Sequence, residues 1–168
     1  MKKLLLSFAL LGVVACQQNK IGYVDNEEII NDYQAKIDVE AKFKKKAEAL
    51  GKKTDSLRQA FQLEATAFQT KAQSMPQKKA QEEYAVLQQR SQFLSQQIQQ
   101  EEQQLQLASQ TEMDSIISNV KDEIKKYGEA NKYTFILGGG DNGSVLYGTE
   151  GDEITESILK ILNNNYKK

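Results

Sequence analysis

Few side chains in this sequence are of a type that could carry out chemistry. Its 168 residues include no His and only one Cys. Without imidazole, histidine acid–base catalysis and histidine metal ligation are excluded. A single thiol excludes an intramolecular disulfide and a cysteine metal cluster. Neighbouring carboxylates such as Glu101 and Glu102 fall on the surface of a predicted helix. We therefore predict that the chain is not an enzyme and has no catalytic residue, metal or cofactor.

A glycine-rich segment from Gly138 to Gly143 has the glycine spacing of a phosphate-binding loop. Such a loop needs Lys after its last glycine, and Ser144 stands there instead. No βαβ pattern surrounds the segment, so we interpret it as a turn. The net charge of −1 argues against a nucleic-acid-binding surface. With only 39% hydrophobic residues, the chain is not expected to enclose a large globular core.

Cys16 is the one residue for which the sequence predicts a covalent modification. Two lysines precede an apolar run, Leu4 to Val14, which has the length of a signal-peptide core and is too short to span a membrane. The residues Val13-Val14-Ala15-Cys16 then resemble the bacterial lipobox, in which the Cys is acylated. We predict that residues 1–15 are a lipoprotein signal and that Cys16 is a lipid anchor. The residue after Cys16 is Gln17, not the Asp that is linked with retention of bacterial lipoproteins in the inner membrane, and this favours an anchor in the outer membrane. The alternative is a plain secretory signal with an incidental Cys.

The middle of the chain, residues 35–127, reads as long helix. It contains one Pro and one Gly, and Ala, Glu, Gln, Lys and Leu dominate. Seventeen Gln between residues 59 and 110 could indicate disorder. However, apolar or small residues recur in steps of three and four, as in a coiled-coil seam. The regular period favours helix over disorder.

Pro76 divides this region, and we expect the chain to turn near residues 74–79. Ser74 is the expected N-cap of the second helix, with Pro76 in its first turn. The two arms then pair antiparallel, with Phe68 near Tyr84 and Phe61 near Ser91. The alternative is one kinked rod. Residues 36–79 carry 11 Lys/Arg and 5 Asp/Glu, and residues 80–126 carry 4 and 8, which favours pairing. Three lysines are expected near the tip, either as a basic binding surface or simply as the solvated residues of a turn: Lys71, Lys78 and Lys79.

The two ends of the chain, residues 16–34 and 128–168, are expected to form a small α/β body. Residues 20–25 alternate like a strand, and Asp25 or Asn26 can cap a following helix. Residues 133–137 and 144–147 are predicted to form a β-hairpin, and a last helix is expected from Asp152. Three short strands leave open edges, so we expect oligomerisation through this body. Its core or interface residues are predicted to be Tyr23, Val24, Phe135, Leu137, Val145 and Tyr147.

In order and spacing, these segments resemble the Skp/OmpH family of periplasmic outer-membrane-protein chaperones. The resemblance covers about residues 20–166, from Ile21-Gly22-Tyr23-Val24-Asp25 through the helical hairpin to Tyr133-Thr134-Phe135-Ile136-Leu137, Val145-Leu146-Tyr147 and Gly151-Asp152-Glu153-Ile154-Thr155. It implies an α+β fold, predominantly α. In that fold a long antiparallel coiled-coil tentacle stands on a small β body, in a jellyfish-like homotrimer. The chain departs from the family in two ways. It has a lipobox and a sequence pI of about 5.7, whereas family members are commonly soluble and basic, and its loop from Gly138 to Gly143 is long.

The resemblance also implies a function: holding unfolded outer-membrane proteins in the periplasm without ATP. The arm residues expected to meet such clients are apolar, although each could instead hold the two arms together. They are Phe61, Phe68, Met75, Tyr84 and Phe93, of which Phe93 lies off the seam. The alternative function is a lipid-anchored structural coiled coil, a spacer or scaffold of the cell envelope. That alternative leaves the strands at both ends without a role.

Overall fold

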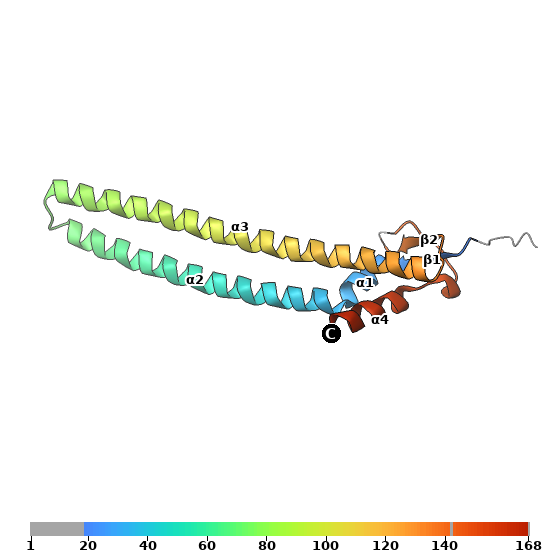
Figure 1. The fold of residues 1–168 in the computed structure, drawn as a ribbon. Helices are drawn as coiled ribbons and strands as arrows, with labels where there is room; N and C mark the ends of the chain where they lie inside the picture. The colour runs from blue at the N-terminus through green and yellow to red at the C-terminus, as the bar shows by residue number, and fades with distance from the viewer. Residues whose placement is uncertain (1–18, 142, 168) are drawn as a thin grey trace, which may run out of the picture.

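The computed structural model describes residues 19–141 and 143–167. In chain order its elements are β1 (Ile21–Asp25), α1 (Asn26–Asp32), α2 (Gln34–Ala72), α3 (Gln77–Ala130), β2 (Phe135–Gly139), a 3-10 helix η1 (Glu150–Asp152) and α4 (Thr155–Tyr166). The helices α2 and α3 run antiparallel as a long arm, and both ends of the chain meet at its base (Figure 1). This confirms the predicted α+β fold with a helical hairpin.

The turn at the far end of the arm lies where Pro76 predicts it. Helix α2 ends at Ala72, and α3 begins at Gln77 with Pro76 as its N-cap. The prediction that Ser74 is this cap is wrong. The Ser74 hydroxyl donates instead to the Lys71 carbonyl, 3.1 Å away, and so completes the end of α2. Pro76 has extended backbone angles (φ −56°, ψ 135°), which start α3 without a side-chain cap.

The arm is thinly packed along most of its length. At 1.5 Å per residue, α2 and α3 are about 58 and 81 Å long. The rings of Phe68 and Tyr84 stack with centroids 6.3 Å apart, as the predicted register requires. Yet no residue from 55 to 115 is buried. Phe43 and Thr54, nearer the base, are 7% and 6% exposed. The arm therefore holds together through a narrow seam and has no interior of its own.

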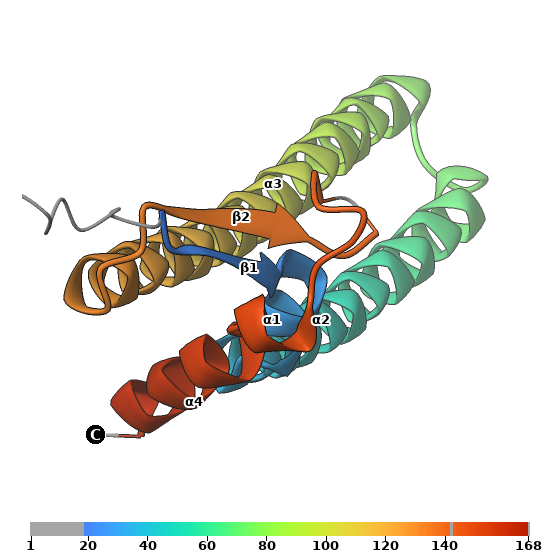
Figure 2. The ribbon, with the colours of Figure 1, turned by 90° about the vertical axis from the view of Figure 1, so that its right-hand side faces the viewer.

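The body is built on a two-stranded parallel sheet (Figure 2). Strand β1 pairs with β2 from Ile21 opposite Phe135 to Asp25 opposite Gly139. Parallel strands need a long crossover connection, and here the whole arm serves as that connection. Asp25 ends β1 and caps α1, because its Oδ1 accepts hydrogen bonds from the backbone N–H groups of Glu27 and Glu28 at 2.9 and 3.0 Å. This confirms one of the two predicted caps.

The predicted hairpin between residues 133–137 and 144–147 is wrong. Strand β2 continues into Gly138 and Gly139, and Gly140 turns the chain with a φ of 81°. The N–H groups of Ser144 and Val145 both donate to the Gly138 carbonyl, at 2.8 and 3.1 Å. A single acceptor for two successive donors makes a tight bend and leaves no ladder. Residues 143–149 are therefore irregular, despite their β-rich composition.

The last helix begins three residues later than Asp152, at Thr155. Glu153 is extended and pairs with Tyr23 of β1, and the Ile154 N–H donates to the Tyr23 carbonyl at 2.9 Å. Helix α4 then packs against β1, α1, α2 and α3. This contact closes the core of the body, which is formed by Val24, Ile29, Tyr33, Ala35, Ile116, Val120, Ile154, Ile158 and Leu162.

The arm contains one helical glycine whose replacement should stabilise the chain. A Cβ added at Gly51 would meet nothing within 4 Å. Glycine in a helix interior costs about 0.5–1 kcal/mol relative to Ala. We expect Gly51→Ala to raise the free energy of unfolding in urea by about this amount. The reverse change at an exposed position of the same helix, Ala60→Gly, should lower it equally; stabilisation by both would contradict the account.

Candidate functional site

The aromatic and Met residues predicted to meet clients divide into two groups. Phe61, Phe68 and Met75 are half-buried in or near the seam. Tyr84 and Phe93 are 53% and 64% exposed on α3. The structure thus brings Phe68 and Tyr84 together and sets Phe93 apart from the seam. Phe93 remains the member of the set with most surface free for another molecule.

Three further apolar side chains of the arm are open to solvent, and the sequence reasoning missed them. Leu63, Val86 and Leu107 are 73%, 63% and 63% exposed. Val86, Phe93 and Leu107 are seven and fourteen residues apart, so they share one face of α3. Their signal in the sequence is an apolar residue off the seam that recurs with the heptad period. We call Leu63, Val86, Phe93 and Leu107 the exposed arm residues.

Four ion pairs join α2 to α3. They are Lys42–Glu112 (2.6 Å), Lys53–Glu101 (2.7 Å), Arg90–Glu64 (2.7 Å) and Lys71–Glu83 (3.7 Å). All of these side chains are partly exposed, so solvent screens each pair and its contribution to stability is small. At 100° per residue, all four pairs fall on the same side of the seam. Ion pairs therefore connect the two helices along one long edge of the arm.

Glu101 has the most perturbed carboxyl of the arm. Lys53 Nζ donates to both of its oxygens at 2.7 Å, and Gln97 Nε2 donates to one at 3.0 Å. These hydrogen bonds favour the charged form and lower the pKa of Glu101 below its ordinary value of 4.5. The carboxylate therefore adds stability above its unfolded pKa, and that stability is lost as the pH falls through the lower folded pKa.

This pKa shift predicts a pH-dependent effect of one substitution. Glu101→Gln should lower the melting temperature at about pH 7, and the difference from the native chain should shrink as the pH falls below the unfolded pKa. The same substitution in a Lys53→Met chain should have a smaller effect, because the partner is gone. A difference that does not shrink as the pH falls, or is undiminished without Lys53, would contradict this assignment.

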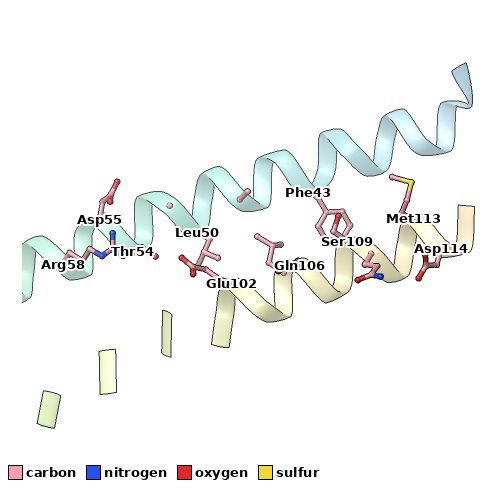
Figure 3. A pocket seen from close by; sticks show the side chains of 14 residues that line it. Phe43, Leu50, Thr54, Asp55, Arg58, Glu102, Gln106, Ser109, Met113 and Asp114 are labelled. Carbon is pink, nitrogen blue, oxygen red and sulfur yellow. The ribbon is translucent and has the colours of Figure 1, made fainter. Parts of the chain in front are cut away.

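The opposite edge of the arm, near its base, is open. A groove of about 760 Å³ lies between α2 and α3. Phe43 and Leu50 project into it from α2 and Met113 projects from α3 (Figure 3). Asp55, Arg58, Glu102 and Asp114 also line it. Neither the composition nor the residue spacing of the sequence predicts this groove, because the groove depends on the distance between the two helices.

The basic residues of the tip lie around the turn as predicted from their positions. Lys78 and Lys79 are exposed in the first turn of α3. Lys71 is 64% exposed in its side chain and forms its ion pair with Glu83. Lys78 and Lys79 have no ion pair within residues 19–141 and 143–167 and remain free to meet anionic groups.

The body residues predicted as core or interface are also divided. Val24 is 2% exposed and belongs to the core. Tyr23 is half-buried and donates a hydrogen bond from its hydroxyl to Glu153 Oε2 at 3.3 Å. Val145 is half-buried too. Phe135, Leu137 and Tyr147 are 58%, 43% and 87% exposed. Three of the six predicted residues are thus exposed, and two of these three lie on β2.

Some predicted features lie outside the part of the chain that the structure describes, namely the signal (residues 1–15) and Cys16. Among the helices that it describes, none combines the length and apolarity that crossing a membrane requires. Within the same residues, no three His, Cys, Asp or Glu side chains gather as metal ligands would.

Comparison with known proteins gives two matches. The family model "Outer membrane protein (OmpH-like)" matches residues 20–162. A solved structure of a proposed outer membrane chaperone (OmpH-like) from Caulobacter crescentus is similar in fold, with a TM-score of 0.78. The two sequences are 16% identical, and the match covers 88% of this chain and 85% of that one. No functionally curated protein matches the chain at a significant level.

Proposed function

The chain belongs to the OmpH-like outer membrane protein family, and we propose that it is an ATP-independent holding chaperone for unfolded outer-membrane proteins. The observation that carries the proposal is the state of the arm. Residues 55–115 include no buried residue, while Leu63, Val86, Phe93 and Leu107 are each more than 60% exposed. Apolar side chains on a long arm without an interior are available to another chain.

The same features suit holding and release. An unfolded barrel protein presents apolar side chains in many different orders, so the surface that receives them must adapt. A thin arm joined by a narrow seam and by surface ion pairs bends at low cost. Contacts with scattered exposed side chains are individually weak, so the client is shielded from other clients and can still leave. The free Lys78 and Lys79 at the tip would favour acidic client segments or an anionic membrane surface.

The assay that tests this function is dilution of an unfolded outer-membrane barrel protein out of urea. The purified mature protein should reduce light scattering by the client at a near-stoichiometric ratio, with and without ATP. A lipid-anchored spacer or scaffold, the alternative function, has no reason to do so. Unchanged scattering at a several-fold excess of the chain would contradict the chaperone proposal.

We further propose that the body joins three chains. Phe135 and Leu137 on β2 and Tyr147 after it are exposed, and β2 has no strand partner other than β1 within the described residues. A free edge with apolar neighbours favours pairing with another copy. Sedimentation equilibrium of a soluble Cys16→Ser form should give a trimer at micromolar concentration, and a monomer would contradict the assembly.

The proposed location is the periplasm, with acylated Cys16 anchoring the chain to the outer membrane. Strand β1 begins at Ile21, so only four residues lie between the anchor and the body, and the chain from Cys16 to Ile21 can span at most about 18 Å. The body lies at the opposite end of the molecule from the tip (Figure 1). The anchor would therefore hold the body at the membrane and let the arm project away. Mass spectrometry of the native N-terminus should find a lipid-modified Cys16; a free thiol would remove the anchor.

A further inference from the structure

The groove between α2 and α3 differs from the rest of the arm in shape. It runs from Phe43 to Arg58 along α2, a rise of about 22 Å. Its volume is about 760 Å³, and an unfolded client segment enters it without regular helix. A single extended strand of six or seven residues, at about 3.3 Å per residue, matches the length.

The groove also differs from the opposite edge of the arm in its charges. There, charged side chains pair across the two helices. At the groove, Asp55, Arg58, Glu102 and Asp114 line the opening, and none of them forms an ion pair or side-chain hydrogen bond within the residues that the structure describes. Three carboxylates against one guanidinium give the residues that line the groove a net negative charge at neutral pH. These charged groups are free to pair with a ligand.

The floor of the groove is apolar and has room to spare. Phe43, Leu50, Leu105 and Met113 supply its apolar surface. Gly51 lines the groove without a side chain, and a Cβ added there would meet no atom within 4 Å. Phe43 is 7% exposed and fixes the end nearest the body. A ligand lying here would bury apolar side chains on the floor and place polar ones at the charged rim.

We propose that this groove binds an extended segment of the client chain in which apolar residues alternate with Lys or Arg. The inference rests on the proposed holding function and adds a sequence preference to it. Successive side chains of an extended segment point to opposite sides. The apolar set therefore faces Phe43, Leu50 and Met113, and the basic set reaches Asp55, Glu102 and Asp114. The remainder of the arm would hold client segments without this preference.

Two eight-residue peptides test the preference, one alternating Leu and Lys and the other alternating Leu and Glu. The mature trimer or monomer, as it exists in solution, should bind the basic peptide about tenfold more tightly in fluorescence anisotropy. Gly51→Trp fills the groove where there is space for a larger side chain, and should weaken binding of the basic peptide about tenfold. The matched control is Ala60→Trp, on the ion-paired edge of the same helix, which should change binding less than twofold.

A second variant removes charge and leaves the shape unchanged. Asp55→Asn, Glu102→Gln and Asp114→Asn together should abolish the difference between the two peptides. Equal binding of both peptides by the native chain, or binding unaffected by Gly51→Trp, would overturn the inference. A change of oligomeric state on Gly51→Trp would also overturn it, because a second copy would then occupy the groove. Suppression of client aggregation is measured separately, so loss of the peptide preference with intact suppression refutes the groove and leaves the holding function.

Discussion

An Ile158→Ala variant is expected to lose about 2–5 kcal/mol of unfolding free energy, the largest effect of any single substitution considered for this chain. Ile158 is fully buried, with an exposed fraction of 0%. It belongs to the core cluster that α4 closes over β1, α1 and the base of the arm. Removal of its side chain leaves a cavity in a core of nine buried residues, the one buried cluster among the residues that the structure describes.

Urea unfolding followed by circular dichroism would measure this loss. At this chain length, each kcal/mol corresponds to a drop of about 2–4 °C in melting temperature. Leu107→Ala removes a side chain of the same volume at a 63% exposed position and is the matched control. It should cost less than about 0.5 kcal/mol. Equal losses from the two variants would mean that the chain is not stabilised from the body.

The second large effect is expected on client holding. A variant with Leu63→Ser, Val86→Ser and Phe93→Ser should bind an unfolded barrel protein about tenfold more weakly. Full burial of such a side chain contributes about 1.5–3 kcal/mol, and a loose contact recovers on the order of 0.5 kcal/mol of it. Three such losses together make about 1.5 kcal/mol, which is the tenfold change.

The same variant should keep the melting temperature of the native chain, because all three side chains are already more than 60% exposed. A triple change of exposed glutamines on the same arm, Gln59→Ser, Gln89→Ser and Gln96→Ser, controls for altered helix propensity. It should leave the client affinity within about twofold. Equal weakening of client binding by both triple variants would show that the client does not bind through the exposed apolar side chains.

The parts of the fold that follow local rules could be predicted from the sequence. Pro76 cannot continue a helix, and the apolar steps on either side of it fix a seam, so the turn and the Phe68–Tyr84 contact follow. Asp25 precedes two glutamates and a helical apolar face, so its cap follows as well. In each case the residues within one turn or one seam contain the information.

The parts that depend on distant contacts could not be predicted in the same way. Residues 144–147 have β-rich composition, but the Gly138 carbonyl takes both available N–H groups and bends the chain. Helix α4 begins at Thr155 and not at the predicted Asp152, because the Ile154 N–H bonds to the carbonyl of Tyr23, more than a hundred residues away in the sequence. In both places a hydrogen bond to a residue outside the segment overrides the local preference of that segment.

The candidate site shows the same division. Phe93 could be singled out because it lies off the seam, and Val86 and Leu107 share that property at the heptad spacing. The groove could not be predicted, because its space depends on the separation of two helices whose facing residues, Gly51 among them, are not contiguous in sequence. The client contacts of Phe61, Phe68 and Met75 stay predictions, since the seam accounts for these residues without a client.

Hydrogen exchange of a bound client is the measurement that tests the holding function most directly. An outer-membrane barrel protein diluted from urea into the mature chain should elute with it as a soluble complex. Its backbone amides should exchange as fast as those of an unfolded chain, apart from short segments in contact with the arm. The account predicts this combination of solubility with fast exchange. A client that elutes alone, or one that exchanges slowly throughout as a folded barrel does, would contradict it.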